Sequence, residues 1–90
     1  MEEIIEMSIE TPDGTADCRL ELMEDNGVYY YTATILYPHI VNGYSRSEIH
    51  CMDVCRDGTD YYLKAGEDGI HPKLKKLEGQ IAAAIQKANK

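Results

Sequence analysis

The sequence has no tryptophan and no phenylalanine, only three cysteines and three prolines, and no long run of apolar residues. Three cysteines cannot form a complete disulfide framework, so we interpret them as small apolar side chains in a reducing compartment. The uncharged apolar stretches are far shorter than the roughly 20 residues that cross a bilayer. The first ten residues carry four glutamates, which does not fit a signal peptide. These absences predict a cytoplasmic protein that does not span a membrane.

Basic residues are scarce in the first third of the chain. Residues 1–27 hold nine acids and one base, a charge of −8, whereas residues 28–90 hold seven acids and eight bases, a charge of +1. Binding to nucleic-acid phosphate needs a concentrated basic surface, and a short lysine-bearing helix on an acidic body does not provide one. We therefore expect no direct binding to nucleic acid.

Hairpin turns are the clearest local signal. With 90 residues the chain fits one domain, because a chain of this size buries only about 60–65% of its unfolded surface. The dipeptides Asn26-Gly27, Asn42-Gly43 and Asp57-Gly58 tolerate the positive φ angles that two-residue hairpin turns require. A four-residue loop at residues 12–15 is predicted to close a further hairpin before them.

A register test supports these hairpins. Side chains alternate between the faces of a strand, and pairing outward from each turn places apolar residues opposite apolar residues. The central pairs predicted in this way include Leu20 with Ala33, and Ala33 with Met52. The outer pairs include Met7 with Leu20, and Met52 with Leu63. One continuous apolar face results.

A single helical pattern lies at the end of the chain and is expected to cover that face. Its apolar residues recur at three- and four-residue spacing, and they are Leu74, Leu77, Ile81, Ala84, Ile85 and Ala88. His71-Pro72 provides a helix start. Gly79 is expected to lower helix stability by about 1 kcal/mol relative to alanine, or to let the helix approach the sheet closely.

The predicted fold is α+β: a five-stranded antiparallel β-meander with one C-terminal α-helix packed on one face. Residues 1–90 form a single domain in this prediction. The strands are expected at about residues 3–11, 16–25, 28–37, 46–56 and 59–65, and the helix at about residues 73–88.

The tip of the central hairpin, at residues 38–47, is the first candidate binding site. The hairpin is longer than the helix, so the tip is expected to protrude or bend, with Pro38 at a strand end or bulge. The candidate partner-binding residues of the tip are Ile40, Val41, Tyr44 and Arg46. The alternative is that the tip folds back and buries its apolar residues at the end of the core.

The acidic first hairpin is the second candidate. The predicted register places Glu6 opposite Glu21, and Glu10 opposite Asp17, on the outward face. Like charges directly opposite one another are destabilising unless water and salt screen them or a basic partner meets them. These four acids are therefore candidate partner-binding residues, with a merely solvated face as the alternative.

The sheet face away from the helix is the third candidate. It is expected to carry a mixed, partly apolar set of side chains that one helix cannot cover. The candidate self-association residues on it are Met23, Tyr30, Thr32 and Tyr62. The alternative is an ordinary half-polar antiparallel face in contact with water.

Motifs for catalysis, cofactors or metals are not found in the sequence. Cys51 and Cys55 would lie about 13 Å apart on a strand, too far for one zinc site, and His50 points to the face opposite Cys51. No glycine-rich phosphate loop occurs. We therefore expect no enzyme activity, no cofactor and no metal.

Two functional hypotheses follow. The first is a non-enzymatic, small acidic protein-interaction module that docks on a basic, nucleic-acid-binding surface of another protein. In size and charge only, the chain resembles the inhibitors that phages and mobile elements direct against host nucleases and defence complexes. The second is a homodimeric structural or small-ligand-binding domain that uses the open sheet face.

Overall fold

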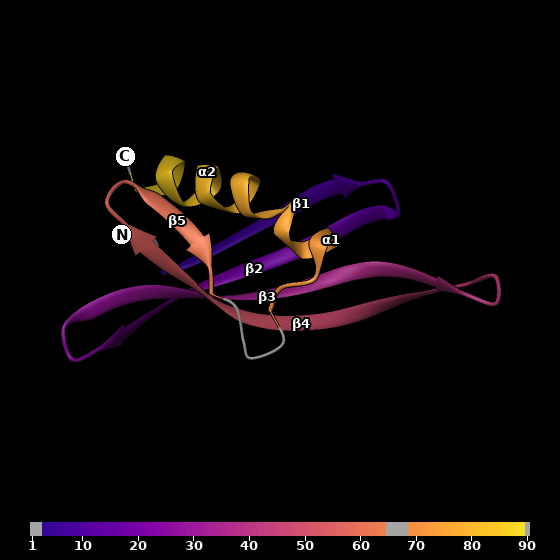
Figure 1. Cartoon of the computed structure of the whole chain (residues 1–90), viewed down its shortest axis with the longest axis horizontal. Helices are drawn as coiled ribbons and strands as arrows, with labels where there is room; N and C mark the ends of the chain where they lie inside the picture. Colours follow the sequence, from indigo (N-terminus) through magenta and orange to yellow (C-terminus); the bar gives the residue numbers. More distant parts are fainter. Residues whose placement is uncertain (1–2, 65–68, 90) are drawn as a thin grey trace.

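The computed structural model describes residues 3–64 and 69–89 of the chain. Five strands are followed by two short helices (Figure 1). The elements are β1 Ile4–Thr11, β2 Gly14–Asp25, β3 Val28–Val41, β4 Tyr44–Asp57, β5 Asp60–Leu63, α1 Pro72–Lys75 and α2 Glu78–Ala88. The strands form one antiparallel sheet in chain order, which confirms the predicted α+β meander. Neither of the described helices is long and apolar enough to cross a membrane.

The two central strand pairings have the predicted register. Leu20 pairs with Ala33, and Ala33 pairs with Met52. The φ angles at the two turns are 51° and 82° for Asn26-Gly27, and 50° and 79° for Asn42-Gly43. Turns with positive φ at both central positions match the twist of the flanking strands. The two Asn-Gly dipeptides therefore account for these two connections.

The predicted pairing of β1 with β2 is wrong by two residues. The turn contains only Pro12 and Asp13, and Thr11 pairs with Gly14. The Thr11 side chain closes this turn, because its Oγ1 donates to the carbonyl oxygen of Gly14 at 2.7 Å and accepts from the Asp13 N–H at 3.1 Å. These hydrogen bonds support a two-residue turn where the sequence predicted a four-residue loop.

The predicted pairing of β4 with β5 is also shifted by two residues. The turn occupies residues 58–59, and Gly58 has a φ of 65°. A glycine with positive φ at the first central position is typical of a type II′ turn, whereas the prediction placed it second. Leu63 therefore pairs with Val54 rather than facing Met52.

Both shifts leave every side chain on its predicted face, because side chains alternate with a period of two. Met7, for example, faces Cys18 rather than Leu20, and all three lie on the apolar face. Residue 65, the last of the predicted fifth strand, lies outside the described residues.

β3 continues through Pro38 to Val41, although the sequence predicted a strand end or bulge at this proline. Pro38 pairs with Ser47, and the register directs its ring nitrogen toward β2. Pairing between β2 and β3 ends at Leu36, so the missing N–H does not remove a ladder hydrogen bond. Residues 38–47 form a two-stranded extension, the ribbon, which projects beyond the other strands (Figure 1).

The predicted helix is bent into two segments, α1 and α2. α1 begins as expected, with Pro72 in its first turn and the His71 side chain accepting from the Lys73 N–H at 3.1 Å. The buried helical residues follow the predicted stripe, and they are Leu74, Leu77, Ile81 and Ile85. α2 contacts both edge strands, β1 and β5, because the sheet curls around it (Figure 1).

The core lies between the curled sheet and the helices. Its buried side chains are Ile9, Ala16, Cys18, Leu20, Tyr31, Ala33, Ile35, Tyr37, Val54, Leu63, Leu74, Leu77, Ile81 and Ile85. We call the sheet face toward the helices the helix-covered face, and the other the open face. Gly79 is exposed, and a methyl group added there would meet no atom within 4 Å, so it does not serve a close approach to the sheet.

Candidate protein-binding surface

The open face exposes several large apolar side chains. The exposed fractions are 68% for Ile49, 45% for Ile4, 43% for Tyr62, 38% for Met23 and 36% for Leu36. Thr34 and Cys51 are exposed between them, with Thr34 Oγ1 4.0 Å from Cys51 Sγ. Leu36 and Ile49 pair on neighbouring strands, and adjoining apolar surface of this kind is typical of an interaction site.

The four acids predicted to bind a partner lie exposed on the open face over β1 and β2. They are Glu6, Glu10, Asp17 and Glu21, and we call them the acidic patch. The predicted like-charged pairs do not form, because the shifted register places Glu6 opposite Arg19 and Glu21 opposite Ile4. One base therefore lies among four acids, and the patch remains negatively charged.

Hydroxyl groups hold two of these carboxylates in place. Ser8 Oγ donates to Asp17 Oδ1 at 2.9 Å, and Thr15 Oγ1 donates to Glu10 Oε1 at 2.7 Å. A hydroxyl donor orients a carboxylate without neutralising it. Glu10 and Asp17 are thus partly preorganised anions rather than free side chains.

The acidic patch adjoins the apolar part of the open face. Asp17 pairs with Leu36, and Leu36 pairs with Ile49 on the next strand. A hollow of about 470 Å³ lies at this boundary, and its lining includes Glu6, Ser8, Asp17, Arg19, Thr34 and Leu36. An acidic surface and an exposed apolar surface therefore meet on one side of the sheet.

The predicted partner-binding residues of the tip do not all lie on one face of the ribbon. Ile40 and Tyr44 are 67% and 75% exposed, so the tip does not fold back to bury them. Ile40 lies on the open face with the acidic patch. Val41 pairs with Tyr44, and strand alternation places both, with Arg46, on the opposite side of the ribbon. Only Ile40 therefore shares a face with the acids.

The four predicted self-association residues are only partly brought together. Met23 pairs with Tyr30 on adjacent strands, and Thr32 lies two residues farther along β3. Tyr62 pairs with Cys55 on β4, so β4 separates it from the other three. Tyr30 and Thr32 are half-buried, and the exposed members are Met23 and Tyr62.

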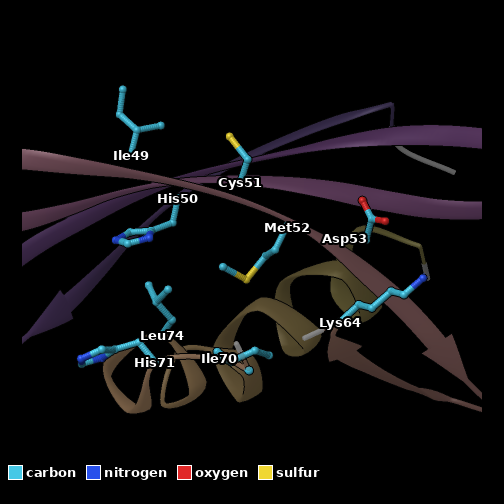
Figure 2. A pocket seen from close by; sticks show the side chains of 10 residues that line it. Ile49, His50, Cys51, Met52, Asp53, Lys64, Ile70, His71 and Leu74 are labelled. Carbon is cyan, nitrogen blue, oxygen red and sulfur yellow. The ribbon is translucent and has the colours of Figure 1, made fainter. Parts of the chain in front are cut away.

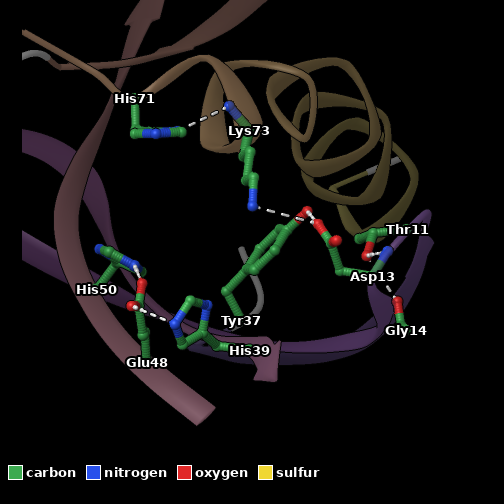
Figure 3. Close-up of polar contacts among 9 residues, drawn as sticks. All are labelled: Thr11, Asp13, Gly14, Tyr37, His39, Glu48, His50, His71 and Lys73. Carbon is green, nitrogen blue, oxygen red and sulfur yellow. Dashed lines mark hydrogen bonds and ion pairs between the residues drawn. The ribbon is translucent and has the colours of Figure 1, made fainter. Parts of the chain in front are cut away.

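A histidine cluster was missed by the sequence analysis (Figure 3). The Glu48 carboxylate lies 3.8 Å from His39 Nε2 and 3.3 Å from His50 Nε2. His71, which precedes α1, lines the same cleft of about 280 Å³, so all three histidines of the chain meet there. The register carried part of this signal, because residues 39, 48 and 50 alternate onto one face of the sheet.

A second polar group links α1 to the sheet beside this cleft (Figure 3). The Tyr37 hydroxyl donates to Asp13 Oδ2 at 2.9 Å, and Lys73 Nζ lies 3.5 Å from the same oxygen. Lys73 also lies 5.7 Å from the centroid of the Tyr37 ring. The Tyr37 hydrogen bond, helped by the charge of Lys73, holds the pKa of Asp13 below its ordinary value of 3.8.

The metal-ligating types of side chain within residues 3–64 and 69–89, the cysteines included, do not form a cluster with metal-binding geometry. Among these residues, no group of three or more histidine, cysteine, aspartate or glutamate side chains is placed to hold a metal ion. Burial raises the pKa of the Cys18 thiol to about 11, which disfavours the reactive thiolate.

Comparison of the chain with protein-family models, with curated protein sequences and with solved structures finds no match.

Proposed function

We propose that this protein is a non-enzymatic interaction module whose acidic patch docks on a basic surface of another protein. One observation carries the proposal: the acidic patch and exposed apolar side chains lie side by side on an open sheet face. Asp17 adjoins Leu36, and Leu36 adjoins Ile49, which is 68% exposed. Apolar contact supplies affinity, while surrounding charge steers the encounter and selects the partner.

A nucleic-acid-binding surface is the class of partner that fits this charge. Such a surface is built to meet rows of phosphates, and the acidic patch offers Glu10 and Asp17 already oriented by hydroxyl donors. The module would then occupy that surface and exclude nucleic acid from it. Inhibition of a nucleic-acid-binding protein is the resulting proposed activity.

The test compares two variants with three charge reversals each. The patch variant carries Glu10→Lys, Asp17→Lys and Glu21→Lys, and the control variant carries Asp25→Lys, Asp57→Lys and Asp60→Lys. All six acids are exposed. Each protein is immobilised, exposed to extract of the native host, and its bound proteins are identified by mass spectrometry after elution with duplex DNA.

We expect the wild type and the control variant to retain the same nucleic-acid-binding protein, which duplex DNA releases. The patch variant should retain at least about tenfold less, because each reversal replaces attraction by repulsion at the docking surface. Retention should also fall steeply as salt is raised from about 0.1 to 0.5 M. Equal retention by both variants, or a captured protein that DNA does not displace, would contradict the proposal.

A homodimeric domain that uses the open face is the second candidate function. It is favoured by Met23, which is 38% exposed and pairs with half-buried Tyr30 on the neighbouring strand, and by Tyr62, which is 43% exposed on the far side of β4. Tyr30→Glu would place a charge in such an interface. Light scattering should then show a dimer for the wild type and a monomer for this variant; a Tyr30→Glu dimer would exclude the open face as the interface.

A further inference from the structure

Within residues 3–64 and 69–89, part of the outer edge of β4 pairs with no strand. β5 pairs with β4 from Val54 to Asp57, and the Lys64 N–H donates to the Asp53 carbonyl oxygen at 2.9 Å. Gly69 forms an isolated bridge, and no described strand pairs with the outer edge of β4 between Tyr44 and His50. Because Tyr44 pairs with Val41 across a two-residue turn, its backbone groups bond to β3, and those of Ser45, Ser47 and Ile49 point outward. An open strand edge is a template for pairing with another strand.

The outer edge of β5 and its turn, by contrast, are partly occupied by side chains of α2. Leu63 N–H donates to Glu78 Oε2 at 2.9 Å, and Gln86 Nε2 donates to the Thr59 carbonyl oxygen at 2.6 Å. Polar cover of this kind blocks strand addition. The fold therefore partly protects the β5 edge, whereas no strand of the described residues covers the longer edge of β4.

We propose that the open edge of β4 pairs with the same edge of a second copy of this chain. In an antiparallel two-fold arrangement with Ser47 on the axis, Arg46 lies opposite Glu48 of the partner subunit, and Glu48 lies opposite Arg46 of the partner subunit. The segment is thus self-complementary, which an interface between identical subunits requires. Opposite charges directly across two strands stabilise their pairing.

Charge also selects this register over its neighbours. In an antiparallel pair, residues whose backbone groups point outward must lie opposite one another. The nearest alternative registers therefore shift one strand by two residues along the other. One neighbour places Arg46 opposite Arg46 of the partner subunit, and the other places Glu48 opposite Glu48 of the partner subunit. Like charges opposite one another disfavour both. The register centred on Ser47 avoids such contacts.

A groove continues this edge and accounts for the exposed tip of the ribbon. It has a volume of about 640 Å³ and its lining includes His50, Met52, Asp53, Lys64, Ile70 and Leu74. Figure 2 shows His50 and Met52 directed toward Ile70 and Leu74, whereas Ile49 points away. In the proposed register Tyr44 of the partner subunit lies opposite His50, on the side of the groove. Its ring, 75% exposed in one subunit, would enter the groove of the other.

The charge distribution of the whole chain permits this pairing despite a net charge of −7. The acidic patch lies on β1 and β2, and β1 is the opposite edge of the sheet. Pairing at β4 therefore holds the two acidic patches at the far ends of a continuous sheet. Pairing at β1 would instead bring Glu6 and Glu10 of both subunits together.

The experiment measures the mass of the intact protein by light scattering and sedimentation equilibrium from about 1 µM to 1 mM. The wild type should dimerise. Arg46→Glu and Glu48→Arg each turn both symmetric charge pairs repulsive, so each should weaken the dimer at least about tenfold. An equal mixture of the two variants should form a heterodimer, because each variant then supplies the charge that the other needs.

Matched controls separate the edge from other surfaces. Arg56→Glu makes the same change on β4 outside the open segment and should leave the dimer intact, as should Tyr30→Glu on the open face. Ser47→Pro removes the outward N–H on the axis and should weaken the dimer, whereas Ser47→Ala should not. Circular dichroism confirms that each variant is folded.

Three results would overturn the proposal: a wild-type monomer at every concentration, a dimer insensitive to Arg46→Glu, or no heterodimer in the mixture. Dimerisation at β4 does not require a basic partner at the acidic patch, so it goes beyond the proposed function, and either one stands if the other fails.

Discussion

Single side chains decide how α1 is held against the sheet. Tyr37 and Lys73 both reach one carboxylate oxygen of Asp13, which lies in the turn between β1 and β2. Glu78 acts similarly at the other end of the bend, where it accepts from the Leu63 N–H and from Lys75 Nζ. Apart from the contact between Lys75 and Glu78, these contacts join residues far apart in the chain, so spacing along the sequence did not reveal them.

The cysteines provide a prediction at the same scale. Cys18 is 3% exposed and burial raises its pKa to about 11, so at pH 8 only about one molecule in a thousand carries its thiolate. Cys51 is exposed on the open face. N-ethylmaleimide at pH 8 should therefore modify Cys51 at least about 100-fold faster than Cys18, as peptide mass spectrometry would measure.

Unfolding in guanidinium is the control for this labelling. All three cysteines should react there at similar rates, because the unfolded chain exposes them equally. Rapid modification of Cys18 in the folded protein would show that the core around β2 opens on the time scale of labelling.

At the level of the secondary-structure elements, turn geometry determines which residues pair across neighbouring strands. The two Asn-Gly turns set the registers of β2, β3 and β4 correctly, whereas the turns before β2 and before β5 each moved a strand by two residues. Each side chain on the shifted strands lies on its predicted face, but its cross-strand neighbour differs from the predicted one. Glu6 consequently meets Arg19 instead of Glu21.

Gly79 in the first turn of α2 offers an element-scale prediction. Its surroundings are open and its φ is not positive, so an alanine there fits without strain. Gly79→Ala should raise the free energy of unfolding by about 0.5–1 kcal/mol, because alanine loses less backbone entropy in a helix. Urea denaturation followed by circular dichroism would measure the change.

The matched control for Gly79 is Gly43, which has a φ of 79° in the ribbon turn. Gly43→Ala should lower the free energy of unfolding by about 1 kcal/mol or more, because a Cβ is strained at positive φ. A stabilising Gly43→Ala, or a destabilising Gly79→Ala, would contradict this account of the two glycines.

Charge is distributed unevenly over the whole molecule, with the excess of acidic residues on β1, β2 and their turns. The net charge of −7 is the sum of −8 over residues 1–27 and +1 over the remainder. Folding brings that acid to one edge and leaves the opposite edge, at β4, with Arg46 and Glu48 as an alternating pair. Both proposals follow from this separation: a basic partner at one side and a second copy at the other.

Acid should destabilise the fold through Asp13 and Glu78. Hydrogen bonds from Tyr37 and from the Leu63 N–H hold the pKa of these carboxyls below their ordinary values of 3.8 and 4.5. The unfolded chain therefore binds protons first as the pH falls, so the stability that they contribute is present above those values and is lost below them. Thermal melting should show Tm falling as the pH drops from about 5 to 3.

Two variants test whether Asp13 and Glu78 cause this loss of stability at low pH. Tyr37→Phe keeps the Asp13 carboxylate but removes its hydrogen bond, and Glu78→Gln keeps the acceptor for Leu63 but removes the titrating group. Each should make the decline of Tm with falling pH shallower than in the wild type. An unchanged slope in both would show that other carboxyls cause the acid destabilisation.

Much of the fold was predictable, because alternation and turn chemistry are local. The apolar period of two, the Asn-Gly turns and the stripe from Leu74 to Ile85 together indicated a meander with a covering helix. The bend in that helix was not indicated, since it depends on how α2 fits between both edges of a curled sheet. Continuation of β3 through Pro38 depends likewise on where the pairing of β3 with β2 stops.

The candidate surfaces were predictable in membership but not in arrangement. The sequence by itself determined on which face of the sheet the acids and the open-face residues lie, because alternation assigns each side chain to a face, but it left open whether the tip folds back. Only the tertiary structure decided their neighbours: Arg19 beside Glu6, Ile40 parted from Tyr44, and Glu48 between two histidines. It also decided that β5 ends at Leu63 and that no described strand covers the outer edge of β4 from Tyr44 to His50, because strand length depends on pairing across the sheet rather than on local propensity.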